Sequence, residues 1–280
     1  MVSLSVSSLN SGSNGNCYYI SNGQEAILVD VGLSCKETER RMKQVGLSMQ
    51  SVKAILITHE HSDHIKGLEL LSRKYQLPVY ITAATLANCR FTIDPSRVRD
   101  FAPFETFRIG AFEVLPFPKQ HDAADPYSFT VSCEGVSIGV FTDIGIPCEN
   151  LIDQFRQCHA AFLETNYDTD MLENGRYPIH LKRRIRSGKG HLSNAQALEV
   201  FLNYRPSFMT HLFLSHLSQD NNNPALVQEL FTRHSAGTDI IVASRHEPTA
   251  VYTISLPVNK TGTAHPPVRK RTFVYQASLF

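Results

Sequence analysis

The sequence predicts an α+β fold, a sandwich with two β-sheets inside and helices outside. About a dozen short strand-like segments occur along the 280 residues, with helix-like segments interspersed among them. Apolar residues make up 42% of the chain and charged residues 19%, which allows a sizeable core and excludes disorder over most of the length. No apolar run approaches the roughly 18 residues of a membrane-spanning helix, so we expect no membrane partner.

The first third of the chain combines short strands with two helices. The apolar run 26–29 ends at Asp30, Ser34 is suited to cap a helix, and apolar residues recur near helical spacing after Asp63. We therefore expect strands at 2–8, 16–21, 24–30 and 52–57, and helices at 34–45 and 63–75.

The remainder is rich in strands, with turn signals such as Gly110 and the Glu134-Gly135 pair between them. Residues 165–178 are expected to form a loop. The expected strands are 79–82, 104–109, 112–117, 127–133, 136–142, 160–164, 208–214, 239–243 and 249–255, and the expected helices are 149–157, 179–185, 193–203 and 224–234.

A domain boundary is expected near residue 256. The predicted domain covers residues 1–256, and residues 257–280 are predicted to be a basic extension that contains no acidic residue. Lys and Arg total 27 against 26 Asp and Glu, a net charge of +1, so binding of a polyanion needs a local basic patch.

The N-terminal segment and the cysteines indicate a cytoplasmic protein. Residues 1–16 lack the basic and apolar regions of a signal peptide. The six cysteines are scattered and form no C-x-x-C pair, which is typical of reduced thiols.

Three histidines and a carboxylate lie within six positions after the expected strand 52–57. His59 and His61 are two residues apart in an extended turn and can point the same way, while Asp63 and His64 open the next helix and can face a second centre. Such nitrogen and oxygen ligands suit zinc, and also manganese or iron. A solvated His-rich turn is the alternative, and four ligand-type side chains at one strand end make it improbable.

The pattern His59-x-His61-x-Asp63-His64 resembles the signature of the metallo-β-lactamase superfamily. That family has a four-layer αββα sandwich with a metal site at the strand ends, and the resemblance covers roughly residues 1–256. The family's other elements follow in order along the chain, at Asp30, His121, Asp143 and His216.

The resemblance implies two divalent metal ions per chain. It assigns one metal to His59, His61 and His121, the other to Asp63, His64 and His216, a bridging position to Asp143 and a supporting position to Asp30. Asp63 also counts among the implied catalytic residues. Two such cations lower the pKa of a bridging water and hold both oxygens of a phosphoryl displacement. No cysteine occupies a ligand position, unlike many antibiotic-hydrolysing members, which argues against a β-lactamase.

The Gly190-His191 pair resembles the Gly-His motif of tRNase Z and PhnP-type phosphodiesterases, whose histidine protonates the leaving oxygen. Glu164 stands in the place of the tRNase Z carboxylate that orients this histidine, and such a pair is a general acid of the right kind. The alternatives are a helix-entry histidine and an ordinary strand-end carboxylate. The Gly190-His191 motif and the Ser/Gly/Asn-rich residues 11–16 together resemble those of the YycJ/WalJ subfamily. The members of that subfamily are bacterial proteins regarded as DNA exonucleases.

Residues 174–198 carry six basic side chains and no acidic one. Next to a metal site, such a patch could hold a polyanion backbone, and a solvated helix face is the alternative. The residues expected to bind substrate are Lys182, Arg183, Arg184 and Asn194.

The sequence thus favours a dinuclear metal-dependent phosphodiester hydrolase acting on nucleic acid, with DNA preferred and an oligomer compatible with the sequence. Three alternatives remain: a small-molecule phosphodiesterase of the PhnP type, a thioester hydrolase of the glyoxalase II type, and a metal-stabilised interaction module without turnover.

Overall fold

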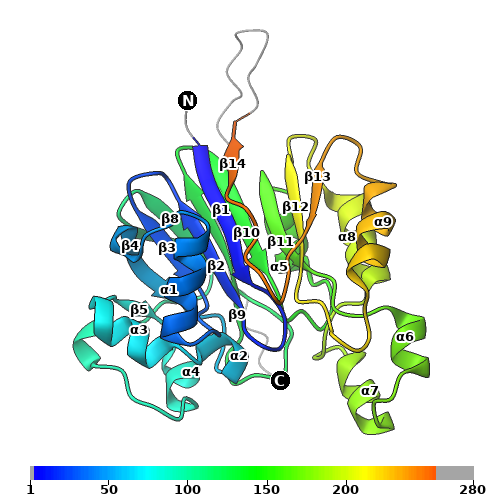
Figure 1. The fold of residues 1–280 in the computed structure, drawn as a ribbon, viewed down its shortest axis with the longest axis horizontal. Helices are drawn as coiled ribbons and strands as arrows, with labels where there is room; N and C mark the ends of the chain where they lie inside the picture. Colours follow the sequence, from blue (N-terminus) through cyan, green and yellow to red (C-terminus); the bar gives the residue numbers. More distant parts are fainter. Residues whose placement is uncertain (1–2, 257–280) are drawn as a thin grey trace, which may run out of the picture.

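Two seven-stranded sheets pack face to face in the structure, a computed structural model that describes residues 3–256 (Figure 1). The predicted α+β sandwich is confirmed. The first sheet has the strand order β14 (Tyr252–Ser255), β1 (Ser3–Asn10), β2 (Cys17–Ser21), β3 (Ala26–Val29), β4 (Val52–Leu56), β5 (Val79–Tyr80) and β6 (Val98–Arg99). The second has the order β13 (Asp239–Val242), β12 (His211–Ser215), β11 (Ala160–Glu164), β10 (Val136–Phe141), β9 (Tyr127–Cys133), β8 (Phe112–Pro118) and β7 (Phe107–Ile109).

Helices cover the outer faces of both sheets (Figure 1). Apolar side chains of α1 (Cys35–Gln44) and α3 (Leu68–Tyr75) pack on the first sheet. Those of α5 (Glu149–Phe155), α8 (Asn194–Tyr204) and α9 (Pro224–Thr232) pack on the second. The described residues also form the helices α2 (Ser62–Ile65), α4 (Ala83–Ala87), α6 (Thr169–Asn174) and α7 (Ile179–Ile185).

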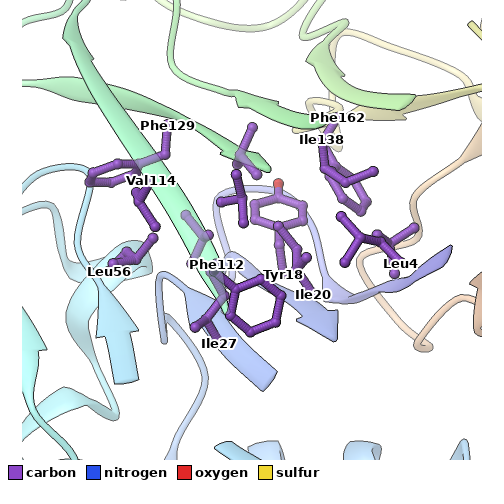
Figure 2. Packing of buried hydrophobic residues seen from close by; sticks show 14 of the residues in the cluster. Leu4, Tyr18, Ile20, Ile27, Leu56, Phe112, Val114, Phe129, Ile138 and Phe162 are labelled. Carbon is purple, nitrogen blue, oxygen red and sulfur yellow. The ribbon is translucent and has the colours of Figure 1, made fainter. Parts of the chain in front are cut away.

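The central core lies between the two sheets, where alternate side chains of both sheets interdigitate (Figure 2). Tyr18 of β2 packs against Phe162 of β11, with ring centroids 4.8 Å apart. The Tyr18 hydroxyl also lies 2.9 Å from Ser11 Oγ. The core therefore anchors the β1–β2 loop, which borders the site described below.

Parallel pairing brings several strand ends to one edge of the sandwich. In the first sheet β3 runs parallel to β4, and in the second β10, β11 and β12 are mutually parallel. Because parallel strands end at the same side of a sheet, residues that follow them gather there. The loops after β3, β4, β10, β11 and β12 carry most of the predicted site residues.

The structure corrects several predicted elements. The expected helix 63–75 is two helices, because Gly67 donates its N–H to Val31 O at 2.8 Å and a Cβ there would lie 2.2 Å from Leu33 O. The expected loop 165–178 contains α6, whose N-cap Asp168 accepts from Met171 N at 3.0 Å. The expected strand 104–109 is shortened to β7, and α4 was not predicted.

The predicted basic extension 257–280 lies outside the described residues. Among the helices of residues 3–256, none has the length and apolar character needed to cross a bilayer.

Candidate metal centre

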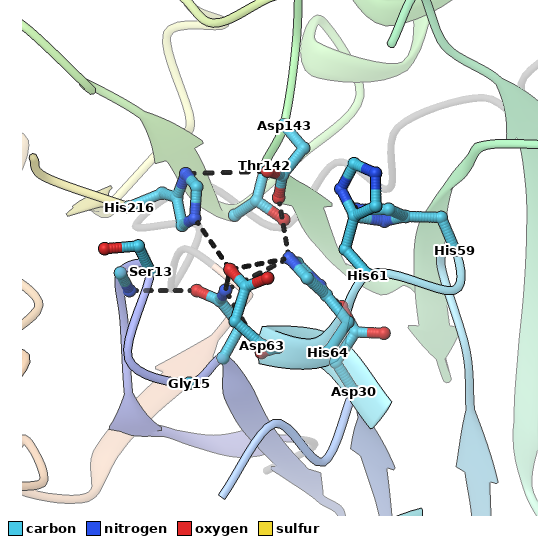
Figure 3. A network of polar contacts seen from close by, with 12 residues as sticks. Ser13, Gly15, Asp30, His59, His61, Asp63, His64, Thr142, Asp143 and His216 are labelled. Atoms are coloured by element: carbon cyan, nitrogen blue, oxygen red, sulfur yellow. Dashed lines mark hydrogen bonds and ion pairs between the residues drawn. The ribbon is translucent and has the colours of Figure 1, made fainter. Parts of the chain in front are cut away.

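Three of the predicted site residues have a left-handed backbone at the end of a strand. Asp30 follows β3 with φ of 59°, Asp143 follows β10 with φ of 56°, and His216 follows β12 with φ of 58°. Non-glycine residues rarely adopt positive φ, and such strain tends to cluster at functional sites. The turns place all three side chains at the edge where the two sheets meet (Figure 3).

His59, His61 and His121 form the first group of candidate ligands. His61 Nδ1 lies 3.1 Å from His59 Nε2 and 3.3 Å from His121 Nε2. Two nitrogens bound to one tetrahedral zinc ion are about 3.3 Å apart, given Zn–N bonds of about 2.0–2.1 Å. The three nitrogens therefore fit one metal ion.

Asp63, His64 and His216 form the second group. Asp63 Oδ2 lies 3.6 Å from His64 Nε2 and 3.5 Å from His216 Nε2 (Figure 3). Within residues 3–256, His216 Nε2 is buried and has no hydrogen-bond partner. Because an unpaired buried nitrogen is costly, its position suits a cation ligand.

Asp143 lies between the two groups. Its Oδ2 is 3.1 Å from His64 Nε2, and its Oδ1 is 3.7 Å from His121 Nε2. Its side chain is almost fully buried, and Oδ2 has no hydrogen-bond partner in the described part of the chain. A carboxylate in this position can reach both metal sites.

Both groups take ligands from both sheets. His59, His61, Asp63 and His64 follow β4 of the first sheet, whereas His121 follows β8 and His216 follows β12 of the second. The centre therefore spans the two halves of the sandwich.

Four of the histidines are oriented by a protein group behind the ring. In each, the Nδ1 atom lies beside an acceptor, which leaves the Nε2 lone pair for a metal. The pairs are His59 with Thr58 Oγ1 at 2.9 Å, His64 with Asp30 Oδ2 at 2.8 Å, His121 with Gly190 O at 3.1 Å and His216 with Glu164 Oε1 at 2.9 Å.

Asp30 lies behind this arrangement and does not face the two groups. It accepts from Thr58 N at 2.9 Å and from Thr58 Oγ1 at 2.9 Å, in addition to its contact with His64. Because the Thr58 hydroxyl donates to Asp30, it accepts from His59 Nδ1. Asp30 therefore fixes one histidine of each group.

The charges differ between the two groups. Burial is the main cause that holds the pKa of His59 well below its usual range and lowers the pKa of His121 to about 4. Burial acts in the same direction on His64, but Asp143, Asp30 and Asp63 outweigh it and raise the pKa of His64 to about 10. The second group is thus surrounded by negative charge that favours a cation.

Glu164 is fully buried and holds His191 beside the second group. Its Oε1 lies 2.8 Å from His191 Nδ1, and its Oε2 accepts from Ile144 N at 2.6 Å and Leu192 N at 3.2 Å. Burial raises the pKa of Glu164, but the positive charge of His191 and His216 and their hydrogen bonds outweigh burial and lower it to about 2. An ionised Glu164 accepts the Nδ1 proton of His191. The remaining nitrogen, Nε2, is on a side chain that is 14% exposed.

The sequence did not single out three polar residues that contact the ligands. Asn16 Nδ2 lies 3.2 Å from Asp63 Oδ2, and Asn166 Nδ2 donates to His216 O at 2.8 Å. Thr58 joins Asp30 to His59, as described above. Asn16 ends the Ser/Gly/Asn-rich loop and Thr58 adjoins the histidine motif, but nothing in the local sequence of Asn166 points to its contact.

The six basic side chains of residues 174–198, called the basic run below, are not all free to bind a substrate. Arg184 pairs with Asp122, with 2.5 Å between Nε and Oδ2, and Arg186 pairs with Glu173. Both acids lie outside residues 174–198, so the run alone does not reveal them. Arg183 is exposed and has no ion pair within residues 3–256.

Two of the predicted substrate-binding side chains are buried. Lys182 is 9% exposed and donates from Nζ to Glu173 O at 2.6 Å. Asn194 is 2% exposed and exchanges side-chain hydrogen bonds with Asn222. Because protein groups occupy both side chains, only Arg183 and Arg184 of the four predicted substrate-binding residues are exposed enough to contact a substrate directly.

Known proteins share this sequence pattern and fold. The family described as the beta-lactamase superfamily domain matches residues 25–216. A Bacillus anthracis protein described as exodeoxyribonuclease YycJ is 38% identical over 230 residues, which cover 80% of this chain and 86% of that protein. A Streptococcus pneumoniae protein described as exodeoxyribonuclease WalJ is 31% identical over 244 residues, which cover 85% and 91%.

A solved structure described as a new diphosphatase from the PhnP family has the same fold. It superposes with a TM-score of 0.63 at 17% identity, and the match covers 91% of this chain and all of that one. The resemblance indicated by the motifs is confirmed by the family match and by the two relatives. The chain therefore belongs to the metallo-β-lactamase superfamily and is one of its metal-dependent hydrolases.

Proposed function

We propose that this protein is a dinuclear-metal phosphodiesterase that acts on DNA as an exonuclease. The observation that carries the proposal is the His191–Glu164 pair, held at 2.8 Å beside two groups of candidate metal ligands. The two relatives described as exodeoxyribonucleases support DNA as the substrate. We place the reaction in the cytoplasm and assign it to a domain of residues 1–256.

Two divalent cations would be held by the two ligand groups described above, with Asp143 between them. Zinc is favoured, because the imidazole nitrogens lie at distances that suit it, and manganese and iron are the alternatives. When bound, such ions supply Lewis-acid stabilisation of phosphate oxygens and activation of a water molecule.

The protein's own residues would bind the substrate and move the proton. Glu164 keeps the proton of His191 on Nδ1, so a protonated His191 can release the proton on Nε2 to the leaving oxygen. A sugar alkoxide is a poor leaving group and needs that proton. Arg183 and Arg184, on α7 shortly before His191, would contact backbone phosphates.

A small-molecule phosphodiesterase is the second candidate. The pairing of Arg184 and Arg186 with acidic residues favours it, because paired arginines attract a long polyanion less strongly. A thioester hydrolase or a module without turnover does not need a proton donor at this position. The contact between the buried Glu164 and His191 therefore argues against both alternatives.

The test compares substrates on one preparation of the metal-loaded protein. We expect shortening of end-labelled DNA from one end, slower hydrolysis of bis(p-nitrophenyl) phosphate and no thioester hydrolysis, with metal content measured on the same sample. Asp143→Ala serves as the inactive control. Hydrolysis of the small diester without any cleavage of DNA would favour the second candidate.

A further inference from the structure

We infer that a cavity beside the second ligand group is a subsite for one nucleotide, in which Arg245 binds the phosphate next to the one that is cleaved. This inference rests on the proposed function, because it assigns part of the same polyanionic substrate to a place on the protein. The predicted basic patch does not include Arg245.

The cavity has a volume of about 280 Å³ and lies between the β1–β2 loop and the loops that follow β12 and β13. Leu217, Pro224 and Val242 give it an apolar wall, and Ser218, Arg245 and other polar residues line the rest. Ligand pockets usually measure roughly 300–1,000 Å³. A cavity just below that range suits a single nucleoside with its phosphate.

Arg245 has unused hydrogen-bonding capacity at this cavity. One guanidinium nitrogen, NH2, lies 3.2 Å from Ser13 Oγ, whereas NH1 is buried and has no hydrogen-bond partner among residues 3–256. No carboxylate of the described residues pairs with Arg245, unlike Arg184 and Arg186. Because a buried unpaired donor is costly and a guanidinium matches phosphate geometry, an anion is the expected partner.

The cavity borders the candidate metal centre through two of its lining residues. Ser11 lines it, and Ser11 Oγ accepts from the backbone N–H of His216 at 2.7 Å. Leu217, which follows His216, also lines the cavity. Ser13, the contact of Arg245, lies in the loop beside Asp63 and His216 (Figure 3). A chain with its cleaved phosphate at the metal centre would therefore place a neighbouring nucleotide here.

The lining favours a nucleotide over a free inorganic anion. An apolar wall offers a surface for the flat face of a base, and the neighbouring polar groups suit the sugar and the base edges. The C-terminal end of α7 lies beside the first ligand group, because Arg184 pairs with Asp122 and Asp122 Oδ1 is 3.5 Å from His121 Nε2. The cavity borders the second group, because Ser11 contacts His216. The strand would run across the centre from one to the other.

The experiment measures the effect of one extra phosphate on the KM of a minimal substrate. The metal-loaded wild type, Arg245→Ala and Arg73→Ala are each tested with the dinucleotide dTpdT, with pdTpdT and with dTpdTp. Arg73 is a matched control, because it is an exposed arginine on α3, removed from the cavity. Circular dichroism and melting temperature establish that each variant is folded.

In the wild type and in Arg73→Ala, one of the two added phosphates should lower KM by roughly tenfold, the effect of one charge-assisted hydrogen bond. In Arg245→Ala the same phosphate should change KM by twofold or less. Arg245→Lys should retain part of the decrease in KM, because lysine keeps the positive charge but lacks the planar guanidinium that can donate two parallel hydrogen bonds to a phosphate. The end at which the phosphate acts shows on which side of the cleaved bond the subsite lies.

The inference is overturned if the gain persists in Arg245→Ala, or if neither phosphate lowers KM in the wild type. The proposed DNA nuclease activity fails if the wild type cleaves neither end-labelled DNA nor the dinucleotides. The same ratios are then taken from dissociation constants of the uncleaved probes, measured by calorimetry. A gain that is lost in Arg245→Ala still supports the subsite, and an unchanged or absent gain rejects it.

Discussion

His191 and His216 share one hydrogen-bond acceptor, because Glu164 Oε1 lies 2.8 Å from Nδ1 of His191 and 2.9 Å from Nδ1 of His216. The sequence indicated only the contact with His191. The structure shows that one buried carboxylate orients both a candidate proton donor and a candidate metal ligand. The two functions are therefore coupled through Glu164.

Glu164→Gln should weaken metal binding as well as turnover. The oxygens of Glu164 face four donors, and an amide NH2 in place of either oxygen would meet donors instead of acceptors. We expect activity on DNA to fall by about 10²-fold or more, together with partial loss of metal. Metal analysis and turnover on the same sample test this; full metal retention would show that His216 does not depend on Glu164.

His191→Ala should separate proton donation from metal binding. His191 belongs to neither group of predicted ligands, so the variant should keep its metal and fold. Turnover of DNA should fall by about 10²–10⁴-fold, the usual cost of losing a general acid, and an aryl phosphodiester should lose much less. Kinetics on both substrates and metal analysis decide the point. Equal losses on both substrates would remove the support for the acid role.

Asp143→Ala should lose more metal than His121→Ala. Asp143 is within 3.1 Å of His64 and 3.7 Å of His121, so its carboxylate can serve both groups, whereas His121 belongs to one. We expect loss of most of two equivalents in the first variant and of about one in the second. Elemental analysis after gel filtration measures this, and small equal losses would contradict the bridging assignment.

Metal affinity should rise with pH. In the metal-free protein three carboxylates raise the pKa of His64 to about 10, so this histidine is protonated at neutral pH and must release a proton to bind a metal. Between pH 6 and 9, affinity should increase by up to about tenfold per pH unit for each proton released. Calorimetric titration in buffers of different ionisation enthalpy counts the protons. An affinity independent of pH would show that His64 is neutral before binding.

Arg183→Ala should weaken DNA binding and lower its salt dependence. Arg183 is exposed and unpaired among the described residues, so it is free to contact a phosphate, and each lost contact reduces the salt slope by about one. Arg184→Ala should have a smaller effect, because Asp122 already neutralises Arg184. Affinities between 50 and 200 mM salt, roughly the range in which such slopes are read, test this with Arg73→Ala as control. If the salt dependence of DNA affinity has the same slope in Arg183→Ala, Arg184→Ala and Arg73→Ala, neither Arg183 nor Arg184 contacts a phosphate.

The sequence motifs pointed to the candidate ligands more directly than to the residues around them. His59, His61, Asp63 and His64 stand out because four ligand-type side chains within six positions are rare. Asp30, Asp143 and His216 were singled out because they follow this motif in the order of the family pattern, each at the end of an expected strand. Asn166 was missed because its contact with His216 is made between residues 50 positions apart. Tertiary proximity of this kind leaves no local pattern.

Contacts between residues that are distant in the sequence also explain why the prediction for the basic run was incomplete. Six positive charges without an acid predicted one open patch, yet the fold brings Asp122 to Arg184 and Glu173 to Arg186. The burial of Lys182, which belongs to α7 and donates to Glu173 O on α6, also depends on where α7 packs. Charge patterns along a chain therefore indicate where an interface could form, but the partners that neutralise it become visible only in three dimensions.

Each ligand group combines residues that follow β4 of the first sheet with a residue that follows β8 or β12 of the second sheet. A bound cation would therefore link the two sheets through coordination bonds. Apolar packing resists separation of the sheets, but it resists sliding of one sheet past the other less strongly, since it has no fixed direction. Coordination bonds do have a fixed direction. Occupancy of the centre would therefore set the relative position of the two sheets, and with it the alignment of His191 from one half against the histidine motif of the other.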